Sequence, residues 1–159
     1  MDEDACIDAI WARWPRLDPV DADLLRFAAE AVERHPKSAE IQWLAGSLNE
    51  LAFLCGLPHP LDPLACYRNA VAIDPTHARA WVSIASWLDV HADDLAGAEA
   101  AYREVLKLDP ESDAYEGLAR VLAEQGRRAE AIEAIEKAPR GDEERRQRLR
   151  EEIERGDWE

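Results

Sequence analysis

Hydrophobic side chains recur at helical spacing in the middle of the chain, over residues 78–110. Two apolar stripes can be followed there, each with the spacing that places side chains on one face of an α-helix. The first stripe consists of Trp81, Ile84, Ala85 and Leu88, and the second of Ala98, Tyr102, Val105 and Leu106. The second stripe ends at Asp109-Pro110, because proline has no amide N–H and disfavours helix for the residue before it. The pattern predicts two helices joined by a turn.

The same two-helix pattern occurs three times along the chain. The first stripe has an earlier and a later copy, which are Ile41, Leu44, Ala45 and Leu48 and then Tyr115, Leu118, Ala119 and Leu122. The second stripe recurs as Tyr67 and Ala70 before Asp74-Pro75, and as Ala131, Ile135 and Ala138. Ile41 lies 40 residues before Trp81, and Trp81 lies 34 residues before Tyr115. The Gly-Leu-Pro-His-Pro stretch at 56–60 explains the longer interval as a lengthened turn.

Both ends of the chain carry helical patterns that depart from this repeat. Residues 4–36 contain two apolar faces separated by prolines, and they predict a degenerate hairpin that covers one end of the stack. Residues 142–155 carry one apolar pair, Leu149 and Ile153, within alternating charges, and they predict a solvated capping helix. The sequence therefore predicts an all-α chain of about nine helices and no strand.

A helical hairpin of about 34 residues, with a large residue, a leucine, a small residue and an aromatic residue at fixed places, resembles a tetratricopeptide repeat. The resemblance is to a small bacterial protein of this family, and it covers three matched units, residues 38–75, 78–110 and 112–139. The chain departs from the family at Ile41, where a large aromatic residue is usual, in the long loop, and after the third unit, where Asp-Pro is missing. The resemblance implies a right-handed α-solenoid of antiparallel hairpins that forms one domain over residues 1–159.

The resemblance also implies that the chain binds other proteins. In the family, the first helix of each unit lines a concave face, so its outward residues form a groove for a peptide or a partner helix. The residues expected to face this groove are Gln42, Asn49, Glu50, Arg79, Val82, Ser86, Asp89, Asp113, Glu116, Arg120 and Glu124. A protein-interaction scaffold or adaptor is therefore the first hypothesis.

The charge of the chain narrows the class of partner. The net charge is −15, whereas phosphate binding needs clustered Lys and Arg, so nucleic acid and anionic membranes are poor partners. Some co-chaperones of the family hold a terminal carboxylate with Lys and Asn, and the groove positions here lack those donors, which disfavours an acidic chaperone tail. A peptide with Arg or Lys, or an amphipathic helix, suits this surface better.

Six tryptophans are a high count for a chain of 159 residues. Trp81 occupies the large-residue position of its stripe, Trp158 is expected to dock on a neighbouring helix, and the others flank the stripes. These others are Trp11, Trp14, Trp43 and Trp87. Packing within the core or between repeats is the favoured interpretation. Because tryptophan is enriched at interface hot spots, one or two of them are also candidates for partner contacts.

Two other functions and one mode of assembly remain as alternatives. Small acidic chaperones of bacterial secretion systems also carry about three such repeats and hold an export client in the groove. A homodimer through an incompletely capped apolar end is the second alternative. A metal-dependent or thiol enzyme is the third, and it is disfavoured because Cys55, His59 and Cys66 have no evident fourth zinc ligand.

Candidate chemistry beyond this is sparse, so no catalytic residue, metal or cofactor is expected. The Asp89, His91, Asp93 and Asp94 cluster lacks the glycine and the alternating oxygen ligands that calcium requires, and no phosphate-binding or hydrolase motif occurs. The three cysteines, among them Cys6, show no disulfide-scaffold spacing and are expected to be reduced and mostly buried. With an acidic N-terminus and no apolar run long enough for a membrane span, the sequence predicts a cytoplasmic location.

Overall fold

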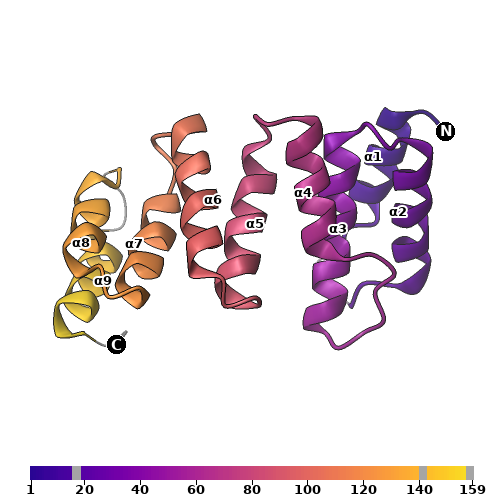
Figure 1. The fold of residues 1–159 in the computed structure, drawn as a ribbon. Coiled ribbons are helices and arrows are strands. Elements are labelled where there is room, and N and C mark those ends of the chain that lie inside the picture. The colour runs from indigo at the N-terminus through magenta and orange to yellow at the C-terminus, as the bar shows by residue number, and fades with distance from the viewer. Residues whose placement is uncertain (16–18, 140–142, 157–159) are drawn as a thin grey trace. The chain divides into compact units, whose positions relative to one another are not determined.

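The computed structural model describes residues 1–15, 19–139 and 143–156. Over these residues the chain forms nine α-helices and no strand, which confirms the predicted all-α fold (Figure 1). Its contacts divide it into two compact units, Met1–Ser83 and Ile84–Glu159, called here the first and the second unit. The expectation of a single domain over residues 1–159 stays a prediction. Among the described helices, none is long and apolar enough to cross a membrane.

The first unit contains α1 (Glu3–Ala12), α2 (Ala22–Arg34), α3 (Ala39–Leu54), α4 (Pro63–Ile73) and the beginning of α5 (Ala78–Val90). The side chain that precedes each of the first four helices accepts a hydrogen bond from a backbone N–H of the first turn. These N-caps are Asp2, Asp21, Ser38 and Asp62. Figure 1 shows α3 and α4 side by side as a hairpin, and α1 and α2 pack beside α3.

The core of the first unit is formed by the apolar stripes of its helices. Its fully or nearly fully buried members include Ile10, Leu24, Leu25, Leu44 and Leu48. Burying such a side chain contributes about 1.5–3 kcal/mol to folding, so these stripes supply most of the driving force for the hairpins. Gly56, with φ of +67°, ends α3 in the left-handed conformation that glycine adopts without strain.

The second unit contains the end of α5, α6 (Leu95–Leu108), α7 (Ala114–Glu124), α8 (Arg128–Lys137) and α9 (Glu143–Arg155). In this unit α7 packs against α6 and α8, and α9 contacts both α7 and α8. The predicted capping helix is therefore present from Glu143 to Arg155, and Ile153 is its buried residue. Asp142 and Trp158 lie outside the described residues.

A buried tyrosine lies against a helical glycine in each unit. A Cβ on Gly46 would come within 2.6 Å of the Tyr67 ring, and a Cβ on Gly117 within 2.3 Å of the Tyr102 ring. Real Cβ atoms do not approach other atoms so closely, so only glycine lets these helices pack on the rings. The same kind of glycine–tyrosine contact therefore determines how closely helices pack in both units.

Trp81 is less buried than its place in the stripe predicts. Ile41, the matching residue of the preceding hairpin, is fully buried, whereas Trp81 and Tyr115 are half-buried. The Trp81 indole N–H donates to the carbonyl oxygen of Pro75 at 2.9 Å, which draws the ring towards the turn before α5. Ala80 is fully buried instead, because a small side chain allows closer helix packing there.

Candidate partner-binding surface

Three tryptophans of the first unit form a continuous aromatic surface, called here the tryptophan face. The ring centroids of Trp11 and Trp14 are 4.9 Å apart, and those of Trp11 and Trp43 are 6.1 Å apart. These distances are typical of favourable aromatic pairs, so the rings hold one another in place. Trp11 remains 42% exposed to solvent. The face therefore combines a large, preorganised apolar area with access from outside.

Arg79 binds to this face from the beginning of α5. Its guanidinium lies 4.2 Å from the centroid of the Trp43 ring, which is the geometry of a cation–π interaction. The same guanidinium donates to both carboxylate oxygens of Glu40, at 3.0 and 2.8 Å. Glu40, Trp43 and Arg79 are called here the Trp43 cation site. In this site an arginine is stacked on an indole and paired with a carboxylate at the same time.

Neighbouring polar groups fix the Trp43 cation site. The Trp43 indole N–H donates to the hydroxyl of Ser83 at 3.1 Å. The Nδ1 atom of His77 accepts from the backbone N–H of Ala80, so the ring proton is on Nε2, which donates to Glu40 at 3.0 Å. Because the carboxylate receives hydrogen bonds from two side chains, its orientation does not depend on Arg79 alone.

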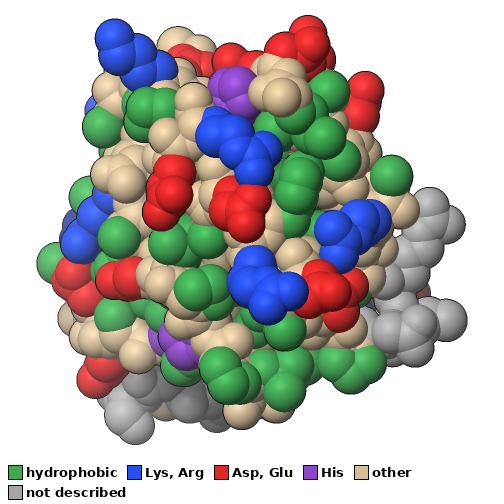
Figure 2. Space-filling model, turned by 90° about the vertical axis from the view of Figure 1, so that its right-hand side faces the viewer, with side chains coloured by type: hydrophobic (Ala, Val, Ile, Leu, Met, Phe, Trp, Pro, Cys, Tyr) green, Lys and Arg blue, Asp and Glu red, His purple; other side chains and the backbone are tan. Residues whose placement is uncertain are grey.

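The side of the first unit that carries α2 has a different character. Figure 2 shows this side, where basic and acidic side chains lie next to one another among hydrophobic ones. Arg26 pairs with Asp23 and Arg34 with Glu30 along α2, and all four side chains are exposed. Exposed pairs of this kind contribute little to stability and are typical of a solvated helix surface.

The predicted groove residues of the first unit do not lie together. Arg79 belongs to the Trp43 cation site, and Val82, one turn further along α5, is 41% exposed. Gln42 and Asn49 are buried, with exposed fractions of 4% and 0%. Asn49 accepts a hydrogen bond from the backbone N–H of Leu61, so it fastens the long loop onto α3. Buried side chains such as these two offer no surface to a partner.

Glu50 is also occupied within the protein. The Tyr67 hydroxyl donates a hydrogen bond to its carboxylate. Burial of the phenol and this bond to a carboxylate both raise the pKa of Tyr67, so the tyrosine stays protonated and keeps donating. Glu50 therefore holds α3 and α4 together.

The predicted groove residues of the second unit are joined by ion pairs. Arg120 of α7 pairs with Asp89 of α5, whose side chain is only 4% exposed. Burial and the charge of Asp89 raise the pKa of Glu124, one turn after Arg120. Glu116 pairs with Arg145 of α9 at 2.7 Å. Ser86 is half-buried and Asp113 precedes α7 as its N-cap residue. Asp89, Glu116 and Arg120 are therefore paired within the unit.

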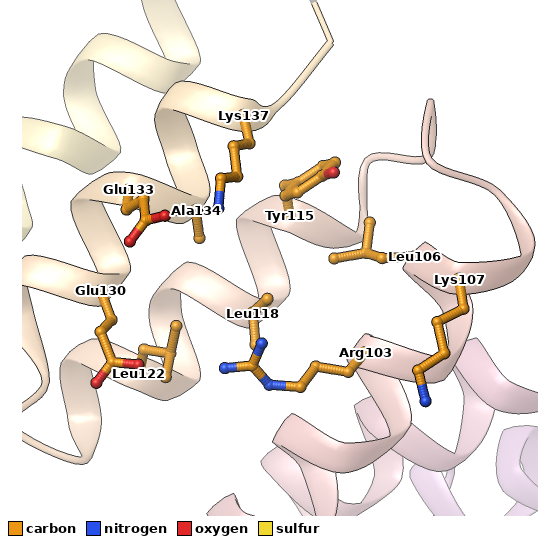
Figure 3. A pocket seen from close by; sticks show the side chains of 10 residues that line it. All are labelled: Arg103, Leu106, Lys107, Tyr115, Leu118, Leu122, Glu130, Glu133, Ala134 and Lys137. Atoms are coloured by element: carbon orange, nitrogen blue, oxygen red, sulfur yellow. Dashed lines mark hydrogen bonds and ion pairs between the residues drawn. The ribbon is translucent and has the colours of Figure 1, made fainter.

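A cleft of about 380 Å³ lies between α6, α7 and α8 of the second unit (Figure 3). Its lining side chains are Arg103, Leu106, Lys107, Tyr115, Leu118, Leu122, Glu130, Glu133, Ala134 and Lys137. Each of its three cations pairs with a carboxylate of its own helix, in the pairs Arg103–Glu99, Lys107–Glu104 and Lys137–Glu133. Because neutralised cations attract an anionic ligand only weakly, this cleft is a weaker candidate than the tryptophan face.

The cysteines belong to no metal site among the described residues. Cys6 and Cys66 are buried, Cys55 is exposed, and all three are free thiols. Burial, together with the charge of Asp62, raises the pKa of Cys66 to about 11, so it is an unreactive thiol at neutral pH. No group of three or more His, Cys, Asp or Glu side chains that could hold a metal ion occurs in the described part of the chain.

Glu40 of the Trp43 cation site and its neighbour His77 were not predicted as site residues. Glu40 precedes Trp43 by three residues on α3, which places both on one helix face, and this spacing is visible in the sequence. The part played by His77 depends on α5 packing against α3, which no local pattern encodes.

Comparisons with known proteins agree with the helical hairpins. Residues 85–145 match the tetratricopeptide repeat family model. None of the curated proteins compared with the chain matches it. One solved structure of the MamA protein shares 23% identity at a TM-score of 0.71, over 84% of this chain and 72% of that one. A second MamA structure shares 17% identity at a TM-score of 0.73, over 97% of this chain and 81% of that one.

A third solved structure is TTC0263, a thermophilic TPR protein in Thermus thermophilus. It shares 16% identity at a TM-score of 0.68, over 98% of this chain and 81% of that one. At these identities the three likenesses show a shared fold, and the family match is confined to residues 85–145. Residues 85–145 of this chain thus resemble tetratricopeptide repeats, and the chain as a whole shares the fold of these three proteins.

Proposed function

We propose that the chain is an adaptor that binds a segment of a partner protein on the tryptophan face of its first unit. Tetratricopeptide repeat proteins generally mediate protein–protein interactions, and no catalytic role is proposed. The observation that carries the proposal is the exposure of Trp11 within a preorganised row of three indole rings. Tryptophan in such a setting is the side chain that most often dominates binding energy at an interface.

The expected partner segment is basic and partly apolar. The chain has a net charge of −15, and Asp4 and Asp8 lie on the exposed side of α1 together with Trp11. Indole rings bind apolar side chains and cations, and a surrounding negative potential steers a basic segment towards them. An amphipathic helix or an extended peptide with Arg or Lys has this chemistry.

The test compares the proteins captured by two variants, each of which loses one exposed aromatic side chain. Trp11→Ala removes the centre of the tryptophan face, whereas Phe53→Ala removes a side chain that is 40% exposed at the far end of α3, about 15 Å along the axis from Trp43. Quantitative mass spectrometry of proteins captured from the native host should show partners that Trp11→Ala loses and Phe53→Ala retains. If both variants capture the same proteins as the wild type, the proposal is wrong. Circular dichroism checks that each variant is folded.

A further inference from the structure

An acid three residues before a tryptophan occurs twice in the first unit, on consecutive first helices of the hairpins. Glu40 precedes Trp43 on α3, and Asp8 precedes Trp11 on α1. Residues three apart lie on the same face of a helix, so each pair presents a carboxylate beside an indole. Because the two indole rings are 6.1 Å apart, the two pairs are neighbours on one surface.

The acid and indole pair on α3 binds an arginine from the same chain. Arg79 comes from the first helix of the following hairpin, stacks on Trp43 at 4.2 Å and pairs with Glu40 at 2.8 Å. The protein itself therefore shows which side chain an acid and an indole in this arrangement accept. A guanidinium suits them because it is planar, always charged and able to stack and donate hydrogen bonds together.

The pair on α1 lacks this arginine. In the 40-residue register that relates Ile41 to Trp81, the residue of α3 that corresponds to Arg79 is Ala39, whose methyl group cannot reach a neighbouring helix. Lys37 corresponds in the same way to His77, and it is exposed. Among the described residues neither Lys37 nor any other cation pairs with Asp8, which is exposed.

We infer that Asp8 and Trp11 form a binding site for an arginine side chain of the partner protein, with Trp14 and Trp43 contacting the apolar residues beside that arginine. The inference rests on the proposed function and names the chemistry of the partner. A single exposed stacked arginine binds weakly, so a partner segment gains affinity by adding contacts to the neighbouring rings. Free arginine has the same guanidinium and serves as a probe of the site.

The direct test is a titration with N-acetyl-arginine amide, followed by NMR through the indole N–H signal of Trp11, which Trp11→Phe assigns. We expect saturable shifts at millimolar concentrations, and a smaller response at Trp43, whose face Arg79 already covers. N-acetyl-citrulline amide, which has the same shape without the charge, should produce no saturable shift. Asp8→Asn should weaken binding about tenfold, whereas Glu33→Gln, the same charge change on an exposed residue of α2, should leave it unchanged.

A second variant tests the internal comparison. Ala39→Arg places an arginine at the position that Arg79 occupies in the following hairpin, and it should occupy the α1 pair and abolish the response of Trp11 to the probe. Ala39→Gln is the matched control and should titrate like the wild type. The inference is overturned if Ala39→Arg binds the probe with the affinity of the wild type. It is also overturned if the wild-type protein shows no saturable shift.

The same variants separate this inference from the proposed function. If captured partners are lost with Trp11→Ala but retained with Asp8→Asn, the tryptophan face binds a partner without an arginine site, and only the inference fails. If Trp11→Ala retains every partner, the proposed function fails as well. If sedimentation shows a homodimer that Asp8→Asn dissociates, the arginine belongs to a second copy of the chain, and the assignment to a different protein is wrong.

Discussion

The two units pack their hairpins in the same way but place their polar groups differently. In each, a helical glycine lies against a buried tyrosine, and apolar stripes close the hairpins. The first unit leaves Trp11 exposed and uses its Arg79–Glu40 pair at the surface, where the arginine side chain is 55% exposed. The second unit pairs Arg120 with the buried carboxylate of Asp89. Outward positions of one fold thus leave an indole ring open to solvent in one unit and hold helices together in the other.

The difference has a direct energetic meaning. A surface ion pair contributes between about 0 and 1 kcal/mol, because water already solvates both charges. A buried carboxylate that loses its partner is destabilising by several kcal/mol, because it has neither water nor a counter-charge. The comparison between the units can therefore be tested by removing one arginine from each.

The largest expected effect is that of Arg120→Met. It leaves the Asp89 carboxylate buried and unpaired, and we expect a loss of about 3 kcal/mol in unfolding free energy, the lower end of the usual range because Arg120 is itself partly exposed. Arg79→Met should cost about 1 kcal/mol or less. Urea unfolding followed by circular dichroism measures both. Asp89→Asn added to Arg120→Met should recover most of the loss, and equal losses for the two arginine variants would refute the comparison.

The glycine–tyrosine contact that both units share gives a smaller effect, which should be similar in the two units. Replacing a glycine inside a helix by alanine usually stabilises it by about 1 kcal/mol. Here the added methyl group meets a tyrosine ring, so Gly46→Ala and Gly117→Ala should instead destabilise the protein by about 1–3 kcal/mol. Thermal unfolding gives the sign. Tyr102→Leu should make Gly117→Ala tolerable by removing the ring, and a stabilising Gly117→Ala would contradict the packing described here.

The helices were predictable because their signals are local. Ser38, Asp62 and Gly56 are capping residues that stand directly at helix ends, and they lie where the structure begins or ends α3 and α4. The 3.6-residue period of the stripes then identifies the buried face of each helix. No knowledge of the neighbouring helices is needed for these assignments.

The candidate site was less predictable because α3 is packed on several sides. Its neighbours include α1, α2 and α4, so residues outside the main stripe, such as Gln42 and Asn49, are buried as well. A polar side chain with helical spacing looks the same in the sequence whether it faces water or fastens a loop, as Asn49 does for Leu61. Arg79 was predicted as a groove residue. Its place on Trp43 depends on the approach of α5 to α3, and the two residues are 36 positions apart in the chain.

The smallest expected effect is the pH dependence of the ionic network in the second unit. Burial by itself raises the pKa of Glu99, but hydrogen bonds from Arg103, Gln125 and Arg127 outweigh it and lower the pKa below its ordinary value of 4.5. The carboxylate therefore stabilises the folded protein above about pH 4.5, and this contribution is lost as pH falls through the lowered pKa. Arg127 also pairs with Glu130. The hydrogen bonds from Arg127 lower the pKa of Glu130 as well.

Glu99→Gln tests this dependence, because glutamine resembles the protonated acid. The variant should be about 1 kcal/mol less stable than the wild type at pH 7, and the difference should shrink towards zero below the lowered pKa, where the wild-type carboxyl is protonated as well. Urea midpoints measured from pH 7 to pH 3 give the difference. Glu33→Gln on α2 of the first unit removes an exposed acid of the same kind and is the matched control. A Glu99→Gln difference that stays constant down to pH 3 would mean that the network is no more than a solvated surface, like the outer side of α2.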